Sequence, residues 1–210
     1  MSDSYEAERE RMVRTVAPRV DDDRVLEALE SVPRHVFVPP VRRDRAYEDR
    51  PLPIGDGQTI SAPHMVAIMT DVLDPEPGES VLEIGTGCGY HAAVTAELVG
   101  EENVYSVEYS DDLAEDARKR LASVGYDGVS VRASDGREGW AEHAPYDAVY
   151  FTCAAATFPS PVVEQVRSGG QLLAPIGTGF QTLVEATKRE DGNLDRTEHG
   201  GVRFVEMRGG

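Results

Sequence analysis

From residue 81 onward, the chain alternates short apolar runs with longer stretches in which apolar residues recur every three or four positions. Short apolar runs are typical of buried strands, and the longer period is typical of helices that bury one face. Strands are predicted at 81–84, 104–107, 129–132, 147–152 and 171–175, and helices at 90–99, 111–124 and 161–167. Strict alternation predicts parallel pairing through right-handed crossovers, and therefore an α/β fold with a mostly parallel sheet.

The segments on either side of this pattern read differently. Helices are predicted at 5–16, 24–31 and 62–73, an ordered irregular segment rich in proline at 32–56, and a closing antiparallel pair at 183–187 and 201–207 around the turn 191–193. Internal repeats and low-complexity tracts are absent from the sequence. We therefore expect one domain over 1–210, in which residues 1–75 pack on a sheet core formed by 76–210.

Composition excludes several classes of protein. The chain has 210 residues, of which 40% are hydrophobic, and no apolar run approaches the roughly 18 residues that a membrane span needs. Its first residues are too charged for a signal peptide, so we expect a cytoplasmic protein without a membrane partner. Cys88 and Cys153 are too few for a disulfide framework and are not spaced as a metal cluster. We expect two reduced thiols and no metal site.

The charge balance adds a second constraint. There are 38 acidic against 21 basic residues, which gives a net charge of −17. Such a surface repels polyanions, so nucleic acid is not expected as a partner. The excess of acid with very little lysine favours a halophile, whose salt-rich cytoplasm screens the repulsion; an ordinary acidic protein is the alternative.

The first candidate site lies where the strand at 81–84 ends, in the sequence Glu83-Ile84-Gly85-Thr86-Gly87-Cys88-Gly89. Glycines at this position allow a sharp turn and a close approach of the backbone to a ligand. The spacing is acid-x-Gly-x-Gly-x-Gly, which differs from the G-x-G-x-x-G that binds a pyrophosphate. A dinucleotide oxidoreductase is therefore disfavoured.

Two further candidates follow the next strands. Glu108 ends the strand at 104–107, where a carboxylate can accept hydrogen bonds from both hydroxyls of a ribose. Asp135 and Gly136 follow the strand at 129–132, where an aspartate can accept from an adenine amino group. Because successive carboxyl ends of a parallel sheet meet at one crevice, these residues together predict a nucleoside site without a phosphate site.

At this point the sequence resembles the protein-L-isoaspartate O-methyltransferase family. The resemblance spans nearly the whole chain and is carried by 34–39, 46–47, 51–55, 57–65, 81–87, 139–140 and 204–205. The run Gln58–Met65 is the most specific part. The resemblance implies a Rossmann-like methyltransferase fold with a seven-stranded, mostly parallel sheet and helices on both faces, and S-adenosylmethionine as the cofactor. Separately, we expect the protein to be a monomer. It also implies methylation of the α-carboxylate of L-isoaspartyl residues in damaged proteins and peptides, as a repair reaction.

The resemblance assigns roles to individual residues. It places Ser61 at the active site, where the hydroxyl would hold one carboxylate oxygen; a helix N-cap is the alternative role for this serine. It assigns cofactor binding to Thr59, His64, Glu83, Gly85, Thr86, Gly87, Gly89, Glu108, Asp135 and Gly136. Methylation of an ionised carboxylate requires neither a metal nor a strong base. From its aromatic character alone, Trp140 is expected to anchor the core.

Two other functions stay open from the sequence. A related enzyme could methylate a different carboxylate. Such an enzyme would differ in the loop 152–159, whose sequence departs from the one usual in the family. A non-catalytic S-adenosylmethionine-binding module is disfavoured because the Thr59–His64 motif is intact.

Overall fold

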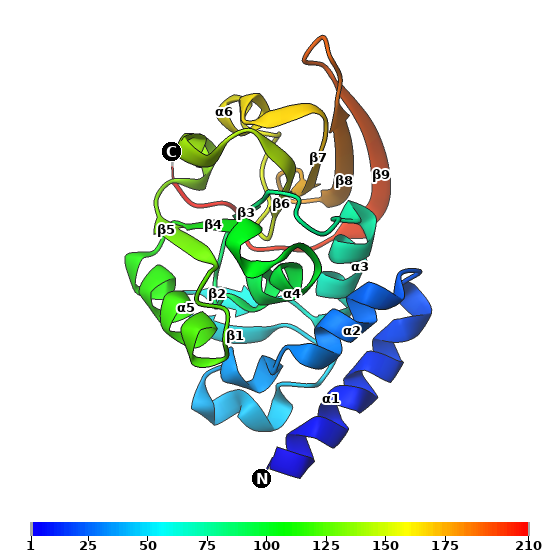
Figure 1. Cartoon of the computed structure of the whole chain (residues 1–210), viewed down its shortest axis with the longest axis vertical. Coiled ribbons are helices and arrows are strands. Elements are labelled where there is room, and N and C mark those ends of the chain that lie inside the picture. Colours follow the sequence, from blue (N-terminus) through cyan, green and yellow to red (C-terminus); the bar gives the residue numbers. More distant parts are fainter. Residues whose placement is uncertain (1, 210) are drawn as a thin grey trace.

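A seven-stranded sheet runs through the middle of the protein, with its strands in the order β5-β4-β3-β6-β7-β8-β9 (Figure 1). The structure is a computed structural model that describes residues 2–209. The strands of this sheet are β3 (Val81–Ile84), β4 (Val104–Glu108), β5 (Ser130–Ala133), β6 (Tyr146–Phe151), β7 (Val166–Ile176), β8 (Gln181–Lys188) and β9 (Leu194–Val202). The pairs among β3 to β7 are parallel, whereas β8 and β9 are antiparallel additions. The predicted α/β fold with a mostly parallel seven-stranded sheet is confirmed.

Within residues 2–209, six α-helices flank the sheet. They are α1 (Ser2–Val16), α2 (Asp23–Ser31), α3 (Pro63–Leu73), α4 (Tyr90–Val99), α5 (Asp111–Ser123) and α6 (Ser160–Glu164). Asp22 caps α2 by accepting a hydrogen bond from the backbone N–H of Arg24 at 2.8 Å, as the acidic run before this helix predicts. Within residues 2–209, no helix is long and apolar enough to cross a membrane.

Two apolar cores fill the two faces of the sheet. Alternate residues of β3 show why: Val81 belongs to the core that α1 to α4 cover, while Leu82 and Ile84 belong to the core on the opposite face. Strands buried on both sides read as continuous apolar runs, which is the pattern that predicted them.

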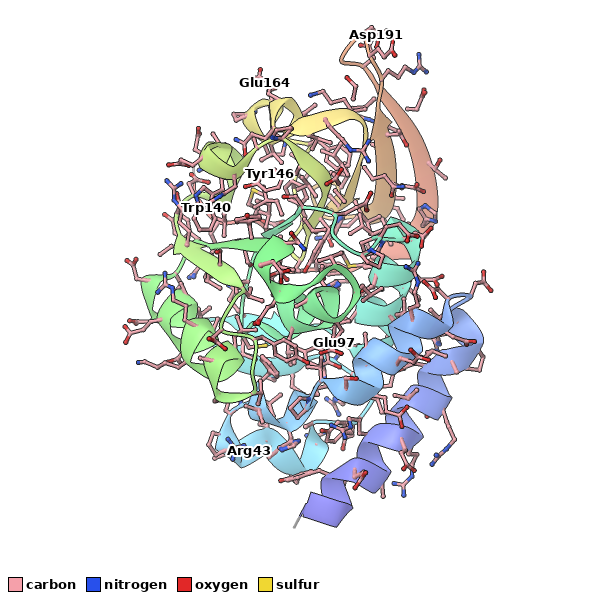
Figure 2. The ribbon with its side chains drawn as sticks, viewed as in Figure 1. Arg43, Glu97, Trp140, Tyr146, Glu164 and Asp191 are labelled. Carbon is pink, nitrogen blue, oxygen red and sulfur yellow. The ribbon has the colours of Figure 1, made fainter. Side chains whose placement is uncertain are left out.

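Trp140 packs against the second core, as predicted. Its ring meets Tyr105 edge-on at 6.0 Å, and its carbonyl accepts a hydrogen bond from the hydroxyl of Tyr146 at 2.7 Å. Figure 2 labels Trp140 and Tyr146, which lie on the same side of the molecule, above α5 in this view.

Three sequence predictions are wrong in detail. The irregular segment 32–56 contains β1 (Leu52–Gly55), which forms a hairpin with β2 (Gln58–Ile60); two prolines in and beside β1 hide it from a propensity reading. The predicted helix 161–167 ends at Glu164, because the chain must turn there to pair β7 with β6. The last strand is β9 at 194–202 and not 201–207. Nearly all of β9 is exposed, so it has no apolar pattern to reveal it.

Residues 203–209, beyond β9, form a tail that returns across the sheet. In Figure 1 this red segment leaves β9 and runs to the opposite side of the molecule, near β5. The backbone N–H of Ala154 donates to the carbonyl of Val205, and that of Met207 donates to the carbonyl of Ala154, each at 2.8 Å. The tail therefore lies against the segment that follows β6, at the carboxyl ends of the parallel strands.

Candidate functional site

A pocket opens at the carboxyl ends of β3, β4, β5 and β6, and we call it the nucleoside pocket. Its floor consists of the glycine turn after β3, and the tail closes one side. The lining residues are Gln58, Thr59, Ile84, Gly85, Gly87, Val107, Glu108, Tyr109, Gly136, Thr152, Cys153, Val205, Glu206, Met207 and Arg208. The crevice predicted for an open α/β sheet is therefore present, at the strands where the candidates were expected.

The glycine turn needs glycine for conformation and for space. Gly85, Gly87 and Gly89 have φ values of 102°, 54° and 91°, which ordinary side chains rarely adopt. A Cβ atom on Gly136 would lie 2.6 Å from Cγ2 of Ile84, so this position also tolerates no side chain. The turn thereby brings bare backbone to the pocket surface.

Glu108 connects the end of β4 to this turn. Its side chain is buried; one carboxylate oxygen accepts from the backbone N–H of Gly87 at 2.8 Å, and the other accepts from that of Ser110 at 3.0 Å. Each oxygen keeps a further lone pair, and the residue lines the pocket. Glu108 is thus held rigidly in place with free acceptor capacity, which suits the two hydroxyls of a ribose.

Glu83 lies below the turn and not in the pocket wall. It is fully buried and accepts hydrogen bonds from Ser106 and, at 3.0 Å, from the hydroxyl of Tyr150. Ser106 in turn contacts the hydroxyl of Thr86 at 2.5 Å. Burial raises the pKa of Glu83 to about 8. Glu83 and Thr86 therefore support the turn from beneath it, whereas the resemblance implied contact with a cofactor.

Asp135 and Gly89 also lie outside the lining residues of the nucleoside pocket. Asp135 caps a short 3-10 helix by accepting from the backbone N–H of Arg137 at 3.0 Å, and its carboxylate pairs with the same arginine. The hydrogen bonds from Arg137 hold the pKa of the Asp135 carboxyl below its usual value. Gly89 is the N-cap residue of α4, where a Cβ atom would lie 3.2 Å from the side chain of Leu121 in α5.

A second hollow adjoins the pocket, and we call it the Ser61 cleft. Thr59, Thr152 and Val205 line both spaces, so they share a wall. The remaining residues of the cleft are Pro51, Ser61, Ala62, His64, Met65, Phe180, Gly201, Val202, Arg203 and Phe204. Of the expected site residues, the structure therefore gathers Thr59, Gly85, Gly87, Glu108 and Gly136 around the pocket and Ser61 and His64 around the cleft.

Ser61 does not cap the helix that follows it. The N-cap of α3 is Ala62, which makes no side-chain capping bond. The carbonyl of Ser61 accepts from the guanidinium of Arg34 at 2.7 Å, while Arg34 also donates to the carbonyl of Ala46 at 2.8 Å. No partner for the Ser61 hydroxyl occurs among the described residues. The backbone of Ser61 is fixed, and its hydroxyl is available to a ligand in the cleft.

His64 is oriented by Asp49. One carboxylate oxygen of Asp49 contacts Nδ1 of His64 at 2.7 Å and accepts from its backbone N–H at 2.9 Å. This pairing leaves Nε2 as the free ring nitrogen. His64 lines the Ser61 cleft and does not line the nucleoside pocket. Its position therefore differs from the cofactor-binding role that the resemblance assigned to it.

The site residues predicted from the sequence leave out several that line it, although the loop 152–159 was singled out as the place where substrate choice would differ. Thr152 lies between the two hollows, and Val205 to Arg208 reach the pocket from the far end of the chain. Cys153 also lines the pocket; burial raises the pKa of its thiol to about 12, so it is a poor nucleophile. Both cysteines are free thiols, as predicted. Over residues 2–209, no group of three or more His, Cys, Asp or Glu side chains is arranged to hold a metal ion.

Comparison with known proteins agrees with this geometry. The family model described as protein-L-isoaspartate(D-aspartate) O-methyltransferase matches residues 7–210. The chain is 50% identical over 207 residues to protein-L-isoaspartate O-methyltransferase 2 of Archaeoglobus fulgidus, covering 98% of this chain and 94% of the relative. It is 48% identical over 207 residues to the protein-L-isoaspartate O-methyltransferase of Methanothermobacter thermautotrophicus, covering 96% and 95%.

Solved structures show the same fold. A protein-L-isoaspartate O-methyltransferase superposes with a TM-score of 0.88 at 29% identity, covering 96% of this chain and 66% of that chain. A Plasmodium falciparum protein, described as a candidate member of this enzyme class and solved with S-adenosyl-L-homocysteine, superposes with a TM-score of 0.82 at 24% identity, covering 97% of this chain and 98% of that chain. The chain therefore belongs to the protein-L-isoaspartate(D-aspartate) O-methyltransferase family.

Proposed function

We propose that this protein transfers the methyl group of S-adenosylmethionine to the α-carboxylate of L-isoaspartyl residues in damaged proteins and peptides. The observation that carries the proposal is the shared wall between the nucleoside pocket and the Ser61 cleft, in a chain of this family. Two reactants bound in these hollows would meet at Thr59 and Thr152. Such side-by-side binding supplies the positioning that a two-substrate reaction needs.

The residues present fit S-adenosylmethionine. Glu108 would accept the ribose hydroxyls, and the bare backbone at Gly85, Gly87 and Gly136 leaves room for the rest of the nucleoside. When bound, S-adenosylmethionine supplies an activated methyl group on a sulfonium. We assign Glu83 and Thr86 to the support of the turn, and Asp135 to the rim beside the adenine end.

The chemistry asks little of the protein beyond placement. The acceptor carboxylate is already ionised at neutral pH, so its oxygen would form the new bond to the methyl carbon without a proton transfer. The sulfur–methyl bond would break in the same step, and S-adenosyl-L-homocysteine would leave as the product. Ser61 would donate a hydrogen bond to one carboxylate oxygen and direct the other towards the methyl group. Arg34 positions Ser61 by holding its carbonyl, and Asp49 positions His64 at the same cleft. The backbone amide nitrogen of the following residue would then attack the methyl ester and expel methanol, and water would open the resulting succinimide in part to normal aspartate.

The test uses two peptides that differ only in an L-isoaspartyl or an L-aspartyl linkage. Each is incubated with the protein and methyl-labelled S-adenosylmethionine, and base-labile methyl ester is counted. We expect labelling of the isoaspartyl peptide alone. Equal labelling of both, or of neither, would overturn the proposed substrate, and labelling of a different carboxylate would favour the related-enzyme alternative.

We further propose that residues 1–210 act as one catalytic domain, a monomer in a salt-rich cytoplasm that does not bind nucleic acid. The support is electrostatic. The net charge is −17, and most carboxylates among residues 5–209 have no lysine or arginine within 4.0 Å. Unpaired like charges repel one another at low salt, and concentrated salt screens that repulsion.

A further inference from the structure

The outer side of the Ser61 cleft carries a large exposed aromatic side chain. Phe180 exposes 80% of its surface, although it lies in the turn between two strands that are otherwise well packed. The tip of its ring lies close to Gly201, since a Cβ atom added there would be 3.3 Å from that tip. The ring therefore has bare backbone beside it, and it lines the cleft. An exposed aromatic ring is a common platform for an apolar side chain of a peptide.

Arg203 lines the same cleft, on a segment that is held in place. The adjacent residue, Phe204, donates its backbone N–H to the buried side chain of Gln181 at 2.6 Å, and its carbonyl accepts from the same amide at 3.1 Å. Gln181 directly follows Phe180. One buried amide therefore fixes the backbone beside both Phe180 and Arg203, so that the two side chains are presented together.

The charge of this cleft is opposite to that of the protein. Although 38 residues of the chain are acidic, no Asp or Glu occurs among the lining residues of the cleft. Arg203 has no carboxylate within 4.0 Å in the described part of the chain. By contrast, the hollow between α1 and the segment 44–49 is lined by four carboxylates, those of Glu8, Asp44, Glu48 and Asp49. The cleft is therefore suited to an anionic ligand.

We propose that Phe180 and Arg203 form a specificity patch that selects the residues flanking the isoaspartyl group. Arg203 recognises an acidic side chain, and Phe180 packs against an aromatic or large apolar one. This inference rests on the proposed function, because it assigns the cleft to the acceptor peptide. The patch contacts the flanking side chains, while Ser61 donates a hydrogen bond to the reacting carboxylate.

The experiment compares isoaspartyl peptides that differ at one flanking position, on each side in turn. Glu, Gln and Lys at this position test Arg203, and Phe and Ala test Phe180. The proteins are wild type, Arg203→Gln, Arg203→Glu and Phe180→Ala. Arg196→Glu is the matched control for Arg203→Glu, because it makes the same change of charge. Arg196 lies on β9 and lines a different hollow. Melting temperatures are recorded to show that every variant is folded.

In 0.05 M KCl, we expect wild type to prefer the Glu over the Lys peptide by about five- to tenfold in kcat/KM, on at least one side. Arg203→Gln should reduce this ratio to within about twofold, Arg203→Glu should reverse it, and Arg196→Glu should leave it unchanged. The preference should shrink in 1 M KCl, because screening shortens the range of the interaction to about 3 Å. We expect wild type to prefer the peptide with a flanking Phe over the peptide with a flanking Ala by about threefold or more in kcat/KM. Phe180→Ala should remove this preference by changing KM and not kcat.

The outcomes separate the two proposals. If wild type methylates the isoaspartyl peptides but shows the same kcat/KM for all flanking residues on both sides, the specificity patch is wrong and the repair activity stands. The same holds if Arg203→Glu and Arg196→Glu change the preference equally. If wild type labels no isoaspartyl peptide above its aspartyl control, the proposed function and the patch both fall.

Discussion

Replacing Glu83 with glutamine tests the buried network beneath the glycine turn. Glu83 is fully buried, and the structure surrounds it with hydroxyl groups, those of Ser106 and Tyr150. Among residues 5–209, no cationic side chain forms a hydrogen bond or an ion pair with Glu83. Burial without a counter-charge raises its pKa from 4.5 to about 8, so that the folded protein holds this carboxyl protonated at neutral pH.

The sign and size of the effect follow from linkage. An acid whose pKa is higher in the folded state stabilises the fold fully below its unfolded pKa, here 4.5, and loses that contribution as pH rises to its folded pKa, here about 8. Each pH unit within this window removes about 1.4 kcal/mol. By pH 7.5, the wild type has therefore lost about 4 kcal/mol relative to pH 4.5. Glutamine has nearly the same shape and is uncharged, as a protonated carboxyl is, but it does not titrate.

The assay is denaturant unfolding of wild type and Glu83→Gln at several pH values between 4.5 and 8.5, at constant ionic strength. We expect similar stability near pH 4.5 and a variant that is more stable by about 4 kcal/mol at pH 7.5, with a melting temperature higher by on the order of 10 °C. His91, whose pKa burial lowers to about 3, titrates in both proteins and so cancels in the difference.

A difference in unfolding free energy that stays constant from pH 5 to pH 8 would refute this reasoning, because it would mean that Glu83 is ionised in the folded protein. A variant that is less stable than wild type at pH 7.5 would refute it as well. Calorimetry with S-adenosylmethionine is the companion measurement. Glu83 supports the turn from below, so its replacement should weaken binding far less than replacement of Glu108.

Four further predictions address the site and the surface. Ser61→Ala should lower kcat by about tenfold or more, with unchanged affinity for S-adenosylmethionine and an unchanged melting temperature, because Ser61 caps no helix; a loss of about 1 kcal/mol of stability with normal turnover would contradict this. Glu108→Ala should raise the Kd for S-adenosylmethionine by about 100-fold in calorimetry, since a ribose diol would lose two hydrogen bonds to a charged acceptor; an unchanged Kd would remove Glu108 from the site. Arg34→Met should cost about 3 to 5 kcal/mol in denaturant unfolding, because the carbonyls of Ala46 and Ser61 each lose a charged donor, and Arg34→Lys should cost less; equal stability of Arg34→Met and wild type would show that these bonds contribute little. The melting temperature should rise by several degrees between 0.1 M and 2 M KCl, whereas a flat profile would defeat the halophile interpretation.

Local sequence signals determined the elements of the sheet core. The strand β3 and the helix α4 have the bounds that their apolar patterns predict, because a strand buried on both faces and a fully buried helix must be apolar along their length. The glycine turn could also be predicted, because only glycine readily adopts φ values of 54° to 102°. Glu108 could be predicted because it is an acidic residue at the carboxyl end of a strand. Family resemblance added Ser61, which no local pattern distinguishes from a helix cap.

Only the tertiary structure decided which residues share a space. The wall between the pocket and the cleft joins Thr59, Thr152 and Val205, which are far apart in the sequence, and the edge strand β9 is too exposed to leave an apolar pattern. The same holds for Glu83: the family resemblance implies a contact with the cofactor, while its full burial places it beneath the turn and outside the pocket lining. Sequence patterns report how much of each residue is buried within its own element. Contacts between distant elements depend on how the tail and the hairpin fold back over the strand ends, and no local period encodes that.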